Sequence, residues 1–167
     1  RKQEELSAST GIPSLVAMVA NSAEEAKIYI DFYRETTNMA FGIDMWVAEK
    51  RAEATEYVAK LGLQDKFLYN SITPWDKDVK GQVRKLKDLG IKHVVVQAFD
   101  DQDQTPAGRV KSLEKLLDQG AGDFETVIVD TSVMNLPATS FSLIANRLIK
   151  EQLGLPCGGA YSNGTHM

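Results

Sequence analysis

The feature that most restricts the fold is a strand-like apolar run followed by a helical pattern, repeated along most of the chain. The repeat has roughly 25–32 residues, which suits a βα unit. Gly62 lies where a left-handed C-terminal cap would sit, and Gly90, Gly120 and Gly154 end the later helical patterns. The expected strands are Leu15–Ala20, Met39–Asp44, Phe67–Ile72, His93–Phe99, Thr126–Thr131 and Leu155–Ala160. The expected helices are Arg1–Ser9, Ala23–Thr36, Ala48–Leu61, Pro74–Leu89, Pro106–Gln119 and Thr139–Leu153.

Strands that are apolar on both faces and alternate with amphipathic helices indicate an α/β fold with a parallel sheet covered by helices. An open doubly wound sheet and a closed (β/α)₈ TIM barrel both satisfy this pattern. No glycine-rich dinucleotide motif or P-loop follows any strand, and the regular repeat favours the barrel. A complete barrel has eight strands over about 250 residues. We therefore expect residues 1–167 to form a single barrel domain that lacks its first strand and its last one or two units.

The charge balance and the cysteine content restrict the partners. Nineteen basic and 23 acidic residues give a net charge of −4, and the absence of a basic patch argues against nucleic acid. The longest apolar runs, such as Val94 to Ala98, are strand-length, so no membrane insertion is expected. Cys157 is the single cysteine, which excludes an internal disulfide, and no Cys/His grouping has zinc spacing, so no metal is expected. A reducing cytoplasm fits this composition best.

Polar residues recur where the expected strands finish, which is the end of a barrel that carries its chemistry. An aspartate after a strand can simply cap the next helix, and Asn70-Ser71 can be turn chemistry. Residues 100–103 read as a solvated loop. The recurrence of carboxylates and amides nevertheless favours a binding site. The set consists of Asn21, Asp44, Asn70 with Ser71, Gln97 with Asp100, Asp130 with Thr131, and Asn163.

The chemistry of this set favours a neutral ligand that is rich in hydrogen-bond donors. No lysine or arginine lies within four residues of Asp130, so an ion pair from its own loop is excluded. A phosphate or carboxylate ligand would require basic side chains or a glycine-rich nest. A 2-amino-4-oxo-pyrimidine edge fits instead, because a carboxylate can accept from its ring N–H and its exocyclic amine together.

Five segments, taken in order, resemble a known family. They are Phe41–Asp44, Leu68–Ile72, Val95–Asp100, Val127–Thr131 and Gly154–Asn163. The ordered set is similar to the H-subunit family of tetrahydromethanopterin S-methyltransferase, and the likeness covers nearly the whole chain. Bacterial members of that family resemble methylcorrinoid:tetrahydrofolate methyltransferases. The family is related to the pterin-binding barrels of dihydropteroate synthase and of methyltetrahydrofolate:corrinoid methyltransferase.

The resemblance implies a TIM barrel that binds a reduced pterin at its mouth. Asp44, Asn70 and Asp130 fall on pterin-anchoring positions, Gln97 belongs to the same pterin-binding set, and Asn163 falls near N5, the methyl-bearing nitrogen. The implied reaction moves a methyl group between a cobalamin or other corrinoid, carried by a partner protein, and N5 of tetrahydrofolate or tetrahydromethanopterin. The implied assembly is a homodimer that meets a corrinoid-binding protein.

Some residues depart from this pattern or carry other interpretations. Met45-Trp46 follows Asp44 where relatives tend to have small polar residues, so Trp46 could stack on the ligand, face the corrinoid partner or pack at the rim. His93 lies at the start of its strand and is interpreted as structural, His166 as a residue that could line the mouth, and Cys157 as a small core residue.

Two alternative functions remain open from the sequence. The first is a pterin enzyme of the dihydropteroate synthase type, which would require lysine or arginine at the late strand ends because it handles a pyrophosphate leaving group. The second is a pterin-binding subunit that serves only as a docking component of a larger methyltransferase complex.

Overall fold

The computed structural model describes residues 1–165 as an α/β fold. Within that range six strands form a parallel sheet in the order β1-β2-β3-β4-β5-β6. A doubly wound sheet would reverse its order partway along, whereas a (β/α)₈ barrel keeps the sequence order. The predicted fold class is therefore confirmed. The strands are β1 (Val16–Val19), β2 (Phe41–Asp44), β3 (Phe67–Ile72), β4 (His93–Gln97), β5 (Thr126–Asp130) and β6 (Cys157–Gly158).

The helices alternate with these strands and differ widely in how much of their surface is buried. The first helix has no buried residue, and none of the described helices is long and apolar enough to cross a membrane. The α-helices are α1 (Lys2–Thr10), α2 (Ala23–Thr36), α3 (Ala48–Lys60), α4 (Val79–Asp88), α5 (Pro106–Leu116) and α6 (Leu136–Leu153). Three short helical turns are η1 (Gln64–Lys66), η2 (Leu117–Ala121) and η3 (Tyr161–Thr165).

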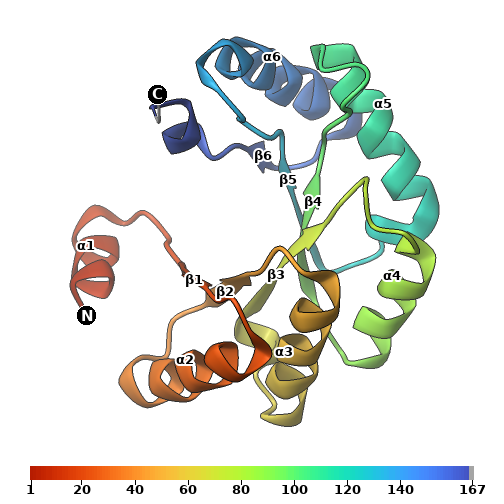
Figure 1. Cartoon of the computed structure of the whole chain (residues 1–167). Helices are drawn as coiled ribbons and strands as arrows, with labels where there is room; N and C mark the ends of the chain where they lie inside the picture. The colour runs from red at the N-terminus through yellow and green to blue at the C-terminus, as the bar shows by residue number, and fades with distance from the viewer. Residues whose placement is uncertain (166–167) are drawn as a thin grey trace. The chain divides into compact units, whose positions relative to one another are not determined.

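The chain divides into two compact units. The first unit comprises Arg1–Asn70 with Leu89–His93. In it β1 pairs with β2 and β2 pairs with β3, while α2 and α3 pack side by side, as Figure 1 shows. The Phe41 ring lies 5.3 Å from the Tyr33 ring and 5.5 Å from the Phe67 ring. These rings join α2 to β2 and β3, and Phe41 and Phe67 belong to the buried core.

Helix α2 has the predicted bounds because its first turn is capped reciprocally. The Ser22 hydroxyl accepts a hydrogen bond from the Glu25 N–H at 3.1 Å, and the Glu25 carboxylate accepts one from the Asn21 N–H at 2.8 Å. This exchange is a capping box, in which two otherwise unpaired N–H groups are satisfied together. Ala26 and Ile30 then bury one face of the helix at helical spacing.

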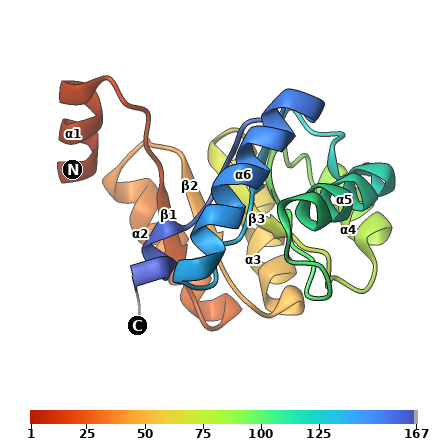
Figure 2. The same cartoon turned by 90° about the horizontal axis from the view of Figure 1, so that it is seen from above.

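The second unit comprises Ser71–Asp88 with the chain from Val94 onward. In it β5 pairs with β6, and α5 packs against α6, as Figure 2 shows. Its core is aliphatic, and Val94, Leu113, Val129 and Ile149 are completely buried. Burial of such side chains contributes about 1.5–3 kcal/mol each, which favours this packing over an exposed arrangement.

Two predicted helix starts are wrong, and local hydrogen bonds explain both. Helix α4 begins at Val79 rather than Pro74, because the Asp76 carboxylate accepts from the Thr73 N–H at 2.7 Å and holds the preceding residues in a turn. Helix α6 begins at Leu136 rather than Thr139. The Asn135 side chain accepts from the Ala138 N–H at 2.9 Å and caps this earlier start.

The predicted glycine positions are confirmed, but the last strand is shorter than expected. Gly62, Gly90, Gly120 and Gly154 all have positive φ angles, between 66° and 93°. Strand β6 covers only Cys157–Gly158 instead of Leu155–Ala160. The chain then turns into η3. His166 lies outside the described residues.

Candidate functional site

In the first unit, Asp44 and Asn70 lie beside each other on adjacent strands. Asp44 is the last residue of β2, and its register partner on β3 is Asn70, two residues before that strand ends. Registered residues of parallel strands project from the same face, so the two side chains share one face. Both are half-buried, and neither side chain has a hydrogen-bond or ion-pair partner among residues 1–165. Two polar groups with unused hydrogen-bonding capacity therefore meet at this end of the strands.

The segment after Asp44 is held by a buried arginine from α3. The Arg51 side chain is 5% exposed; its Nη1 donates to the Met45 carbonyl at 3.0 Å, and its Nε donates to the Tyr69 hydroxyl at 2.8 Å. The guanidinium also lies 5.5 Å from the Tyr69 ring centroid. Trp46 is 84% exposed. The suggestion that Trp46 packs at the rim is therefore wrong, and its indole is available to a ligand or a partner.

In the second unit, hydrogen bonds to the turn after Asp130 link the side chains of Gln97 and Asp130. The Asp130 carbonyl accepts from the Ala98 N–H at 2.8 Å, which places the ends of β4 and β5 side by side. The Ser132 N–H donates to Asp130 Oδ1 at 2.8 Å, and Gln97 Nε2 donates to the Ser132 hydroxyl at 2.7 Å. Ser132 has a φ of 52°, which is unusual for a residue other than glycine. The structure thus brings together two of the predicted residues through a serine that the sequence did not single out.

Asn163 lies on η3, five residues beyond the end of β6 rather than directly on it. The turn is fixed by a hydrogen bond from the Asn163 N–H to the Ala160 carbonyl at 2.9 Å, while the side chain is exposed. A Cβ placed on the neighbouring Gly164 would lie 3.0 Å from Thr139 Oγ1 and 3.6 Å from Val133 Cγ1. Turn η3 therefore packs on the loop between β5 and α6, which is the loop that follows Asp130.

A buried network of hydroxyl groups connects this loop to α6 and β6. The Thr131 hydroxyl is paired with the Ser142 hydroxyl at 2.6 Å and with the Gly158 carbonyl at 2.9 Å. Asn146 Nδ2 donates to the Tyr161 hydroxyl at 2.6 Å, which anchors the start of η3 to α6. Because Thr131 and Ser142 are completely buried, loss of the Thr131 hydroxyl would leave Ser142 with only the longer contact to the Tyr161 hydroxyl at 3.4 Å.

Asp130 has no basic residue close to it in sequence, as predicted, but it has one close to it in space. Arg109, the fourth residue of α5, is completely buried and donates through Nη1 to the carbonyls of Thr131 and Ser132. Burial lowers the pKa of Arg109, and the charge of the nearby Asp130 carboxylate raises it. The available signal was spacing, since Arg109 falls on the helical face that buries Leu113 and Leu116.

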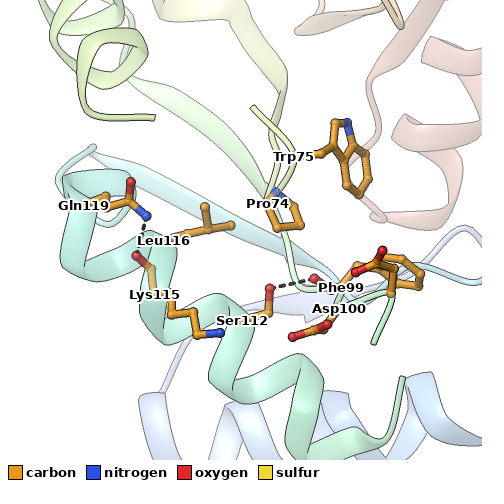
Figure 3. Close-up of a pocket in the computed structure, with 9 residues that line it drawn as sticks. Pro74, Trp75, Phe99, Asp100, Ser112, Lys115, Leu116 and Gln119 are labelled. Carbon is orange, nitrogen blue, oxygen red and sulfur yellow. Dashed lines mark hydrogen bonds between the residues drawn. The ribbon is translucent and has the colours of Figure 1, made fainter. Parts of the chain in front are cut away.

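A cavity of about 350 Å³ also lies in the second unit, but none of the predicted site residues lines it except Asp100 of the wider strand-end set. Figure 3 shows Trp75 and Phe99 on one side and α5 on the other, with the Ser112 hydroxyl donating to the Phe99 carbonyl at 2.6 Å. The two rings make an edge-to-face contact at 6.3 Å. Across the described residues, no three His, Cys, Asp or Glu side chains are arranged to hold a metal ion.

Parallel strands in sequence order, with carboxylates and amides towards their carboxyl ends, define a protein of the (β/α)-barrel class. The chain belongs to the tetrahydromethanopterin S-methyltransferase MtrH subunit family, whose family model matches residues 1–166. The family predicted from the ordered sequence segments is therefore confirmed.

Three relatives are named as the H subunit of tetrahydromethanopterin S-methyltransferase. The relative from Methanosarcina acetivorans is 30% identical over 96% of this chain and 54% of its own length. The relative from Methanopyrus kandleri is 26% identical over 98% of this chain and 53% of its own length. The relative from Methanothermobacter marburgensis is 25% identical over 98% of this chain and 55% of its own length. The chain thus spans about half the length of the curated relatives it matches.

Proposed function

We propose that this chain is the pterin-binding part of a methyltransferase that moves a methyl group between N5 of a tetrahydropterin and a corrinoid carried by a partner protein. The observation that carries the proposal is the match of the family model to residues 1–166. The names of the relatives favour tetrahydromethanopterin as the pterin, with tetrahydrofolate as the second candidate.

Four side chains are proposed to bind the pterin: Asp44, Asn70, Gln97 and Asp130. A carboxylate accepts from the ring N–H and the 2-amino group of the pyrimidine edge, and an amide pairs with one donor and one acceptor. The unused hydrogen-bonding capacity of Asp44 and Asn70 supports this role. The Gln97 amide donates to Ser132, which leaves its carbonyl oxygen as an acceptor for the ligand.

Asn163 is proposed to act at N5. When the methyl group leaves this nitrogen, the N–C bond breaks and its electron pair stays on N5, so an amide N–H directed at this atom gains strength during the reaction. A hydrogen bond of this kind stabilises the transition state more than the ground state. The corrinoid supplies the cobalt that gives or takes the methyl group. Packing of η3 on the loop after Asp130 supports a position for Asn163 near the ligand.

The proposed setting is a larger assembly. The relatives are named as subunits, which supports the interpretation that the chain serves within a methyltransferase complex. A homodimer that meets a corrinoid protein is the assembly we propose. The exposed Trp46, two residues after Asp44, is proposed as a contact for that corrinoid protein.

Calorimetric titration of the full-length protein with tetrahydromethanopterin, tetrahydrofolate and ribose 5-phosphate tests the proposed ligand. We expect binding of at least one pterin and none of the sugar phosphate. Methyl transfer is then followed by the absorbance of methylcob(III)alamin mixed with the pterin that binds. Ribose 5-phosphate binding as tight as that of either pterin, or a bound pterin that never exchanges its methyl group, would contradict the proposal.

A further inference from the structure

Two buried arginines occupy the fourth position of their helices, although Arg51 reaches the loop after the preceding strand β2 and Arg109 the loop after the following strand β5. Arg51 is the fourth residue of α3 and Arg109 is the fourth residue of α5. They are 5% and 0% exposed, although arginine is almost never fully buried unless it is paired. Each donates to a backbone carbonyl directly after a strand-end aspartate, at Met45 in the first unit and at Thr131 and Ser132 in the second. In both cases a buried guanidinium fixes the backbone that follows an aspartate at the end of a strand.

The contacts of Arg109 are directed at one turn. Its Nη1 donates to the Thr131 carbonyl and, at 2.7 Å, to the Ser132 carbonyl, and its Nε donates to the Gln104 carbonyl at 3.2 Å. The guanidinium also lies 5.6 Å from the Phe99 ring centroid. One cation thus draws together two successive carbonyls, which stabilises the left-handed backbone of Ser132 that would otherwise be unfavourable.

The same turn orients the proposed ligand-binding groups. With the backbone of Ser132 in this conformation, its N–H points at Asp130 Oδ1 and its hydroxyl accepts from Gln97 Nε2. If Ser132 adopted an ordinary negative φ angle, both hydrogen bonds would be lost together. The orientation of two proposed pterin-binding side chains therefore depends on the contacts that Arg109 makes with the turn.

The hydrogen bonds of Arg109 indicate that this side chain does more than fill space in the core. They go to backbone carbonyls, and Nη2 has no hydrogen-bond partner within residues 1–165. Burial without a hydrogen-bonded carboxylate is costly, so an apolar side chain would serve packing better. What an apolar side chain cannot do is donate to Thr131 and Ser132.

We propose that Arg109 is a positioning residue of the pterin site, which holds the 130–132 turn so that Asp130 and Gln97 face the ligand. The identity of the ligand in this inference rests on the proposed function. The clamp itself, meaning the hydrogen bonds from Arg109 to the Thr131 and Ser132 carbonyls, does not depend on it. In the first unit Arg51 makes different contacts, to the Met45 carbonyl after Asp44 and to the Tyr69 hydroxyl before Asn70.

Arg109→Met and Arg109→Lys in the full-length protein test this role. Methionine keeps an unbranched apolar stem but removes every donor, and lysine keeps the charge but lacks the planar guanidinium that donates to several carbonyls at once. Arg147→Met is the matched control, because Arg147 is 78% exposed and paired with Glu151. The measurements are the pterin dissociation constant, kcat at saturating pterin, thermal unfolding and hydrogen exchange at the Ser132 amide.

We expect Arg109→Met to weaken pterin binding by about 10- to 100-fold, by analogy with the loss of a contact that orients a metal ligand. The lysine variant should fall between Arg109→Met and wild type, and Arg147→Met should match wild type. The kcat at saturating pterin should change little, because the turn lies at the pyrimidine edge rather than at N5. Exchange at Ser132 should accelerate in both Arg109 variants.

Wild-type pterin affinity in a folded Arg109→Met protein would overturn the positioning role. If the methionine variant does not fold, the lysine variant decides, and wild-type affinity there would equally overturn the role. Failure of the wild-type protein to bind any tetrahydropterin would refute the proposed function instead. In that case hydrogen exchange at Ser132 still tests the clamp, and unchanged exchange in both Arg109 variants would refute it.

Discussion

Replacement of Asp130 by asparagine should separate pterin anchoring from methyl-transfer chemistry. The asparagine carbonyl can keep the hydrogen bond that Oδ1 accepts from the Ser132 N–H at 2.8 Å, so the turn itself should survive. The new amide group, however, places a donor against the donors of the pyrimidine edge. An unsatisfied pair of this kind costs about 2–4 kcal/mol, counting both groups. That free energy corresponds to about 30- to 800-fold weaker pterin binding.

The loss should appear in the pterin KM and dissociation constant rather than in kcat. In the proposed role Asp130 binds the pyrimidine edge equally in the ground state and the transition state, and such uniform binding affects KM alone. Asn163→Ala should behave in the opposite way. If the Asn163 amide reaches N5, its loss should lower kcat by about 10²-fold, as for one transition-state hydrogen bond, with a smaller effect on affinity.

Steady-state kinetics of both variants with methylcobalamin, together with calorimetric pterin titration, measure these quantities. Asp101→Asn is the matched control, because Asp101 is an exposed loop carboxylate in the same unit. A kcat that stays normal in Asn163→Ala and collapses in Asp130→Asn at saturating pterin would refute the assignment of roles.

Three further predictions concern stability and reactivity. Thr131→Val should lower the free energy of unfolding by about 1–3 kcal/mol in urea titrations, because the buried Ser142 hydroxyl loses its partner at 2.6 Å; the exposed Ser140→Ala is the control, and equal midpoints would contradict the network. Ser22→Ala should cost about 1 kcal/mol in the same assay by removing the cap of α2, an effect absent from Ser9→Ala. Cys157 is half-buried rather than a core residue, and this partial burial raises the pKa of its thiol. The thiolate therefore forms at higher pH, and iodoacetamide should label the folded protein more slowly at pH 8.5 than the urea-unfolded chain; equal rates would argue against a shielded thiol.

Local chemistry accounts for the parts of the fold that the sequence predicted well. The bounds of α2 follow from Ser22 and Glu25, which lie three residues apart and cap the helix without help from elsewhere. The wrong starts of α4 and α6 arose from overlooking similar signals at Asp78, whose carboxylate accepts from the Gly81 N–H at 2.8 Å, and at Asn135. These errors were avoidable, since an aspartate or asparagine before a helical pattern is itself a cap.

The electrostatic setting of Asp130 could not be predicted in the same way. Arg109 lies 22 residues from Thr131 along the chain, yet it donates to the carbonyl next to Asp130. Only packing of α5 against the end of β5 brings the two together. A search for charges within a few residues of Asp130 was bound to miss a cation that arrives through tertiary structure. The roles of Asp44, Asn70, Gln97, Asp130 and Asn163 stay predictions until pterin binding is measured.

The left-handed conformation of Ser132 carries a consequence for protein engineering. Glycine adopts positive φ without steric cost, so Ser132→Gly is the substitution that a search for greater thermal stability would select first. Such a variant would relax the backbone but delete the hydroxyl that receives the Gln97 amide. Serine at position 132 therefore accepts an unfavourable backbone conformation in order to keep the Gln97 side chain in place. Screens for stability alone would select against it.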